Sequence, residues 1–147
     1  MLKKKSLILV LAVVLILAFS LSIGYAKEKV LVIGMDTSPI VSLDPAKAYE
    51  FEGSWILDNV YDKLVRFKPG SASEVVPGIA ESWEFSDKTI TFTIRDNAKF
   101  SNGNPVDAEA VAYSLKRVVK LAQAPSWVIT QFGITEDSIK AIGNKVQ

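Results

Sequence analysis

The clearest alternation of apolar and polar positions runs from Ser82 to Arg95 and predicts a β-hairpin. One set of alternate positions is apolar: Trp83, Phe85, Ile90, Phe92 and Ile94. The other set is polar, and the reversal falls at Ser86-Asp87-Lys88. Because successive side chains of a strand point to opposite faces, the pattern predicts a hairpin with one buried and one solvated face.

Apolar residues three and four positions apart predict two helices. The first is expected from Phe51 to about Leu64. Its apolar face would consist of Leu57, Tyr61 and Leu64, with Trp55, Ile56 and Val60 beside it. The second is expected from Ala108 to about Ala122, because Asp107 is a good N-cap and Pro125 ends the helical pattern.

Several short apolar runs predict strands at Val30–Gly34, Val65–Phe67, Trp127–Ile129 and Ser138–Ile142. Asp36–Pro45 is rich in turn-forming residues and is expected to be a loop. The last residues, Lys145 to Gln147, are expected to add no closing element. Interspersed helices and strands predict a mixed α/β fold.

The N-terminal segment has the pattern of a secretory signal peptide. Lys3 to Lys5 are followed by an apolar stretch from Ser6 to Ile23, and Gly24 and Ala26 supply the small residues that a signal peptidase requires. Residues 1–26 are therefore expected to be removed by cleavage after Ala26. The alternative is an uncleaved membrane anchor, since the apolar stretch approaches the length of a spanning helix. Either way, the rest of the chain is expected outside the cytoplasm.

Composition excludes several classes of function. Of the 147 residues none is Cys or His, which excludes disulfides, thiolate metal sites, a lipid-modified cysteine, and the commonest general base and metal ligand. Without its three N-terminal lysines the chain has 14 basic and 16 acidic residues, a balance that argues against nucleic-acid binding. The length suits one domain and is too short for two sizeable lobes.

No arrangement of residues predicts catalysis. Serines are present, but no His exists to activate them and no Ser-x-x-Lys occurs. Glu50 and Glu52 would face different sides of a helix and are interpreted as solvated surface charges. We therefore expect no enzyme, no catalytic residue, no metal site and no cofactor.

Ligand contacts are expected from a loop and an indole. The loop after Gly34 follows the carboxyl end of a predicted strand, an edge where ligands bind in open α/β sheets. Trp127 lies between predicted elements, where an indole either joins the core or forms an apolar wall for a ligand. Burial in the core is slightly favoured for Trp127 and clearly favoured for Trp55 and Trp83.

Two stretches resemble a known family. Val75–Val119 resembles the family 5 extracellular solute-binding proteins, the oligopeptide-, dipeptide- and nickel-binding components of ABC importers. The residues that match are Pro77, Ile79 to Trp83, Phe100, Asn102, Gly103, Pro105, Ala108, Ala110 and Val111. Ser42–Ala46 (SLDPA) and Asp62–Phe67 (DKLVRF) form a second match. Ala110 replaces the usual acid, and the hairpin turn lacks the usual glycine.

The resemblance implies that residues 27–147 are the N-terminal part of the first lobe of a bilobal periplasmic-binding-protein fold, with a β-hairpin-containing subdomain and the second lobe absent. By position, Ser38, Pro39, Ile40 and Trp127 would contact the ligand. The ligand would be an oligopeptide, a sugar or a metal chelate, which a closing, monomeric, periplasmic receptor presents to an ABC permease. The chain by itself is expected not to bind ligand tightly.

Three alternatives stay open from the residues. The chain would be a stand-alone exported envelope module that binds a protein partner through its hairpin, or a non-functional truncated remnant. An exported hydrolase is the third, and the lack of His and Cys weighs against it.

Overall fold

The computed structural model describes Lys4, Leu11 and residues 29–147, which divide into a unit that ends at Gly34 and a second unit from Met35 to Gln147. The predicted signal segment therefore lies, except for Lys4 and Leu11, outside the described residues. In the part of the chain that the structure describes, no helix has the length and apolar character needed to cross a membrane.

The predicted strand Val30–Gly34 is wrong. These residues form no strand, and the side chains of Val30, Leu31 and Val32 are 73%, 83% and 86% exposed. A strand requires a neighbour that takes up its backbone hydrogen bonds. No strand of the described residues pairs with this segment. The apolar run is therefore an exposed, extended part of the first unit.

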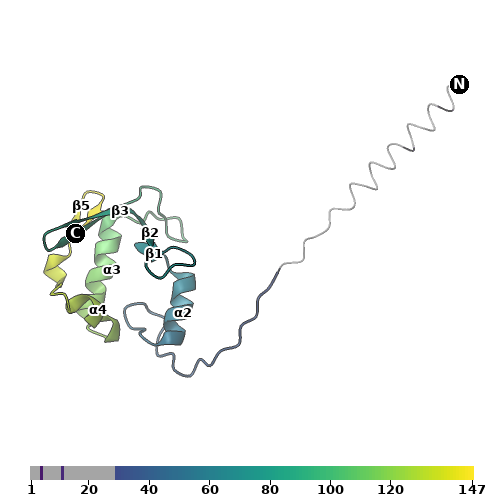
Figure 1. The fold of residues 1–147 in the computed structure, drawn as a ribbon, viewed down its shortest axis with the longest axis horizontal. Helices are drawn as coiled ribbons and strands as arrows, with labels where there is room; N and C mark the ends of the chain where they lie inside the picture. The colour runs from purple at the N-terminus through teal and green to yellow at the C-terminus, as the bar shows by residue number, and fades with distance from the viewer. Residues whose placement is uncertain (1–3, 5–10, 12–28) are drawn as a thin grey trace. The chain divides into compact units, whose positions relative to one another are not determined.

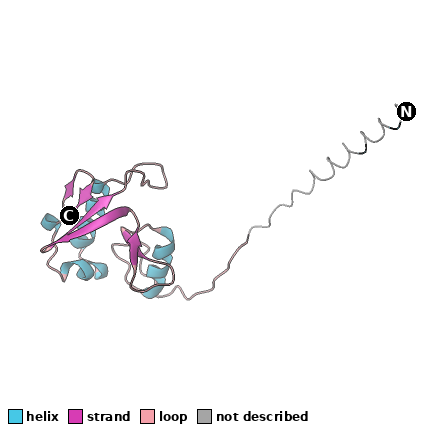
Figure 2. Ribbon diagram, turned by 45° about the horizontal axis from the view of Figure 1, so that its top comes forward, coloured by secondary structure: helices cyan, strands magenta, loops and turns pink. Residues whose placement is uncertain are grey.

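The second unit contains two antiparallel sheets, which Figure 2 shows in magenta. The smaller sheet pairs β1 (Val65–Phe67) with β2 (Val75–Pro77). The larger has the strand order β3-β4-β6-β5, with β3 (Ala80–Ser86), β4 (Thr89–Ile94), β5 (Ala141–Ile142) and β6 (Lys145–Val146). The strand prediction for Val65–Phe67 is confirmed. The fold is a mixture of helix and sheet, as expected.

The hairpin prediction is confirmed in its register and only partly in its burial. Trp83 pairs with Phe92 and Phe85 with Ile90, so the apolar positions share one face. Asp87 makes the turn with φ 49°, a conformation that Asp tolerates better than most residues. Burial is deep at Ile94, which is 2% exposed, but Phe85 near the turn is 77% exposed. The turn end of the hairpin therefore extends beyond the core.

The helix α2 spans Phe51–Val60 and is shorter than predicted. Tyr61 is extended, with φ −109° and ψ 142°, and Leu64 lies beyond the helix. The reason is tertiary: the Leu64 carbonyl accepts hydrogen bonds from the amides of Gly78 and Ala80, at 3.1 and 3.0 Å. A continued helix would direct that carbonyl along its own axis.

Gly78 allows this close approach of two backbone segments. A Cβ at this position would lie 2.2 Å from the Lys63 carbonyl oxygen and 2.8 Å from that of Leu64. Both contacts are shorter than real Cβ atoms make, so any side chain would push the segments apart. The segment that leads from β2 to β3 is thereby held against the segment that leads from α2 to β1.

The helix α3 spans Ala108–Leu121 and confirms its prediction. The Asp107 carboxylate accepts a hydrogen bond from the Ala110 amide at 2.8 Å, which is the expected N-cap. The helix ends at Ala122, whose φ of 48° turns the chain into the left-handed region. In Figure 1, α3 runs beneath the larger sheet.

The C-terminal predictions need three corrections. Trp127–Thr130 is the short helix α4 rather than a strand, because it continues from a 3-10 turn at Ala124–Ser126 in which Pro125 supplies a helical φ. The last residues were expected to add no closing element, and this is also wrong. Strand β6 pairs with β4 and β5, and Lys140 and Gln147 exchange two backbone hydrogen bonds of 2.8 Å. The predicted strand Ser138–Ile142 is too long. The strand consists of Ala141–Ile142 alone, and a 3-10 turn at Glu136–Ser138 precedes it.

The core lies between the larger sheet and α3. Its buried members are Ala80, Ile94, Ala108, Val111, Ala112, Ile139 and Val146. Small residues dominate on α3, so the helix lies close to the strands. Of the tryptophans expected in the core, Trp83 is half-buried and Trp55 is 40% exposed. The expectation for Trp55 is wrong, because the buried positions of α2 are Gly53 and Leu57 and Trp55 lies on a different side of the helix.

We predict that Ile94→Ala lowers the free energy of unfolding by about 2–4 kcal/mol, because it leaves a cavity beside Val146 and α3. The matched control is Phe85→Ala on the same hairpin, which removes more atoms from an exposed position and should cost less than about 1 kcal/mol. Urea unfolding followed by circular dichroism measures both. Equal losses would contradict the assignment of the core.

Candidate functional site

The loop that precedes α2 is folded by its own polar side chains. The Asp36 carboxylate accepts the Ser38 amide at 2.9 Å, and the Ile40 amide donates to the Thr37 carbonyl at 3.1 Å. The bonds from the Ser38 amide and hydroxyl lower the pKa of Asp36. Two consecutive turns therefore fix the direction in which this segment leaves Met35.

Glu50 closes the loop. Its carboxylate accepts the Val41 amide at 2.6 Å and the Tyr49 amide at 2.8 Å, which brings both ends of the loop to one side chain. Hydrogen bonds from the backbone amides of Glu50 itself, Tyr49 and Val41 lower the pKa of Glu50 to about 2. Glu50 lies at the surface, as interpreted, but its carboxylate also holds both ends of the loop, a role that the interpretation did not include.

Asp44 connects the same loop to α3. Arg117 donates two hydrogen bonds to the Asp44 carboxylate, at 2.8 and 2.5 Å, and the Ala46 amide donates a third at 3.0 Å. The Arg117 guanidinium, and after it the Ala46 amide, hold the pKa of Asp44 well below its usual range. The two side chains are 26% and 36% exposed, so the pair is only partly screened by solvent.

An aromatic contact connects the loop to α4. The rings of Tyr49 and Trp127 meet edge to face, with centroids 6.1 Å apart and an interplanar angle of 73°. The two side chains are 49% and 50% exposed, so each keeps about half of its surface open to solvent. This geometry suits an apolar wall on which a ligand group packs. It also corrects the preference for Trp127 as a core residue.

The predicted ligand residues lie in two places, in the loop that precedes α2 and at the Tyr49–Trp127 contact. Ser38 and Pro39 are exposed and Ile40 is half-buried. Trp127 is linked to the loop through Tyr49. The sequence did not predict the contacts of Tyr49, Asp44 and Arg117 with this arrangement. Asp44 stands within the SLDPA motif, but no local pattern indicates that its partner lies 73 positions away.

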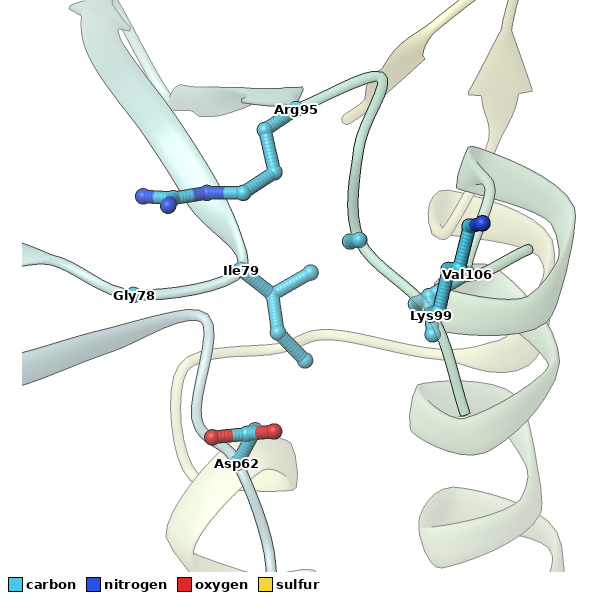
Figure 3. A pocket seen from close by; sticks show the side chains of 7 residues that line it. Asp62, Gly78, Ile79, Arg95, Lys99 and Val106 are labelled. Atoms are coloured by element: carbon cyan, nitrogen blue, oxygen red, sulfur yellow. The ribbon is translucent and has the colours of Figure 1, made fainter. Parts of the chain in front are cut away.

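Two cavities lie away from these residues. The smaller, about 160 Å³, is lined by Asp62, Gly78, Ile79, Arg95, Ala98, Lys99 and Val106. Figure 3 shows Arg95 and Asp62 on either side of Ile79. The Nε of Arg95 is buried and has no hydrogen-bond partner among the described residues.

The larger cavity has a volume of about 480 Å³ and is mainly apolar. It lies between β4, α3 and the segment that precedes β5, with Ile90, Phe92, Leu115, Ile134 and Ile139 in its wall. Neither cavity is lined by Ser38, Pro39, Ile40 or Trp127. Among the residues that the structure describes, no cluster of three or more acidic side chains offers a metal site.

Comparison with known proteins places the chain in a family context. Residues 74–146 match the family model of the bacterial extracellular solute-binding proteins, family 5. A probable D,D-dipeptide-binding periplasmic protein of Escherichia coli is 37% identical over 121 residues, which are 79% of this chain and 23% of the relative. The nickel-binding periplasmic protein of the same organism is 44% identical over 71 residues, 47% of this chain and 13% of the relative.

The fold agrees with solved structures. The murein tripeptide binding protein of Escherichia coli superposes with a TM-score of 0.60 at 32% identity, over 72% of this chain and 24% of that protein. The resemblance identified from the sequence is therefore confirmed. The chain spans less than a quarter of the length of these relatives.

We predict that Glu50→Gln weakens the closure of the loop and speeds hydrogen exchange at the Val41 and Tyr49 amides. Because the folded-state pKa of Glu50 is about 2, lowered from 4.5, its stabilising effect is full above about pH 4.5 and is lost as the pH falls toward 2. The protection of these amides, which is their intrinsic exchange rate at each pH divided by the rate measured by NMR, should fall over that interval in the wild type and show no such fall in Glu50→Gln. Glu52→Gln serves as the control on the same helix, and equal acceleration in it would contradict the assignment.

Proposed function

The chain belongs to family 5 of the bacterial extracellular solute-binding proteins, and from this we propose that it is part of the substrate-binding component of an ABC importer that captures peptides. Residues 27–147 would form part of the first lobe, and the second lobe would come from sequence outside this chain. Closure of the two lobes around the ligand would create the form that the permease recognises. The role is binding and transport, with no enzymatic step and no cofactor.

The same proposal covers the location of the chain. Residues 1–26 would act as a signal peptide, so that the chain works in the periplasm or another extracytoplasmic compartment. The proposal includes no lipid-modified cysteine among these residues, because the sequence given contains no Cys. The receptor would act as a monomer.

The observation that carries the proposal is the half-exposed Trp127 held edge to face against Tyr49 beside a loop closed at both ends. A loop held in one conformation suits an extended peptide, whose backbone needs partners in fixed positions. The Ser38 and Ile40 amides are already bonded within the loop and Pro39 has no N–H, so Ser38–Ile40 would offer its carbonyl oxygens as acceptors for the ligand's amides. Trp127 would pack against an apolar side chain of the ligand. A sugar or a metal chelate would use the same indole, so these ligand classes are outcomes of the test.

A second candidate is an envelope module that binds a protein partner through the hairpin. The favouring observation is that β3 is an edge strand of the larger sheet and ends near Phe85, whose side chain is 77% exposed. An edge strand with an exposed aromatic residue suits the addition of a partner strand. Loss of partner capture in Phe85→Ala, with peptide binding absent, would favour this candidate.

The chain alone should bind peptide weakly, because one wall of a cleft buries only part of a ligand. Calorimetric titration of the chain purified from the extracytoplasmic fraction, with di- and tripeptides, should give no stoichiometric heat at micromolar concentration. Tight binding with a stoichiometry of one would contradict the assignment of the chain to a single partial lobe.

The direct test of function is a chimera in which residues 29–147 replace the matching segment of the D,D-dipeptide-binding relative. We expect this receptor to bind a D,D-dipeptide within about tenfold of its parent's affinity, a difference of about 1.4 kcal/mol. Trp127→Ala should then weaken binding by about tenfold or more. Trp55→Ala, which truncates an exposed indole on α2, is the matched control and should change affinity less than about twofold.

A chimera that folds, by circular dichroism and thermal unfolding, yet binds no dipeptide, tripeptide or sugar would overturn the proposed function. Equal effects of Trp127→Ala and Trp55→Ala would leave the receptor role in place and remove Trp127 from the ligand site.

A further inference from the structure

One ion pair holds the candidate binding loop in place. In the part of the chain that the structure describes, side-chain hydrogen bonds otherwise join residues at most nine positions apart, whereas Arg117 reaches Asp44 across 73 positions. The loop preceding α2 and the middle of α3 are thereby tied by two parallel donor–acceptor contacts.

Asp44 organises the loop on both sides of itself, through its backbone and through its carboxylate. Upstream, the Asp44 amide donates to the Ser42 hydroxyl at 3.0 Å. Downstream, its carboxylate accepts the Ala46 amide and its carbonyl accepts the amides of Lys47 and Ala48, at 2.8 and 2.9 Å. Ala46 and Ala48 are 2% and 6% exposed, so this turn is packed against the rest of the unit. Release of Asp44 would therefore loosen a turn, not merely one side chain.

The turn leads directly to the aromatic wall. Tyr49 follows Ala48, its amide is held by Glu50, and its ring is the edge-to-face partner of Trp127. A turn fixed at Asp44 thus fixes the position from which the Tyr49 side chain departs. Arg117 belongs to α3 and Trp127 to α4. The loop therefore contacts α3 through an ion pair and α4 through an aromatic pair.

We propose that Asp44 and Arg117 are positioning residues of the ligand site, which hold the loop so that Tyr49 and Trp127 form one apolar wall. The inference rests on the proposed function for its purpose, but the arrangement itself is testable without ligand. The bidentate geometry matters as well as the charge, because a guanidinium presents two parallel donors to a carboxylate and an ammonium does not.

The test uses the whole chain labelled with 5-fluorotryptophan and observed by ¹⁹F NMR, with the three resonances assigned by Trp→Phe variants. Asp44→Asn should shift the Trp127 resonance toward that of a solvated indole and leave the Trp83 resonance, which reports on the hairpin, unchanged. Hydrogen exchange at the Ala46, Ala48 and Tyr49 amides should accelerate at least tenfold. Arg117→Lys keeps the positive charge but cannot make the bidentate contact, so it should give an intermediate shift of the Trp127 resonance.

The matched control is Asp58→Asn, the same chemical change in the Asp58–Lys63 pair, where the two atoms are 2.6 Å apart on more exposed side chains. It should leave the Trp127 resonance and the loop amides unchanged. If Asp44→Asn fails to fold, Arg117→Lys decides the question alone. An unmoved Trp127 resonance in a folded Asp44→Asn or Arg117→Lys variant would overturn the proposal.

A second readout separates positioning from general stability. In the chimeric receptor, Asp44→Asn should weaken D,D-dipeptide binding at least tenfold, whereas Asp58→Asn should change it less than twofold. Unchanged affinity together with a shifted Trp127 resonance would overturn the role in ligand binding. Absence of any binding in the unsubstituted chimera would contradict the proposed function, while the ligand-free NMR result would still decide whether the pair positions the wall.

Discussion

The two sheets of the second unit are joined where the backbone of Gly78–Ala80 rests on the carbonyl groups of Lys63 and Leu64. Three backbone hydrogen bonds of 2.9 to 3.1 Å form there, and the clearance is too small for a Cβ at Gly78. The contact fixes where α2 must end, because Leu64 has to face the crossing segment. It also sets the start of β3, and through the hairpin the face of the sheet that covers α3. The positions of α2, β3 and α3 therefore depend on this one backbone contact.

The buried core of the second unit is small, and the helix and strands that form it lie close together. Ala80, Ala108 and Ala112 are almost fully buried, and their short side chains let the helix approach the strands. Ile94 and Val146 then fill the remaining space from two neighbouring strands. The large aromatic residues lie mostly outside this core, so they are available for contacts with other molecules. An apolar cavity lies beside β4, outside this group of small buried residues, and large apolar side chains such as Phe92, Leu115 and Ile134 line it.

Local signals predicted what local interactions decide. The hairpin and α3 followed from alternation, a capping Asp107 and a turn at Asp87, all of which act within a few residues. The end of α2 was not predictable, since it depends on Gly78, which is distant in the sequence. Trp127–Ile129 was mistaken for a strand because so short an apolar run shows no periodicity, and the preceding Pro125 starts a helical turn as readily as it ends one.

The candidate site also has a part that local sequence suggests and a part that depends on tertiary contacts. Its loop and Trp127 were proposed as ligand contacts from their places in the chain, one after an apolar run and the other between elements. Asp44, Arg117 and Glu50 were not found, because their roles arise from the tertiary fold. A carboxylate that receives backbone amides looks, in sequence, like any surface acid. Only the folded chain shows which acids hold the loop.

The strand order β3-β4-β6-β5 has a consequence for the order of folding. The β3–β4 hairpin closes through a short turn and needs little chain entropy, so it can form early. Phe92 of β4, however, pairs with Val146 of β6, and α3 lies between them in the sequence. Until α3 docks and β6 arrives, one side of β4 remains open, with its amides and carbonyls able to pair with another chain. The slowest step of folding, and the interval of greatest risk of aggregation, is therefore expected at the insertion of β6 beside β4.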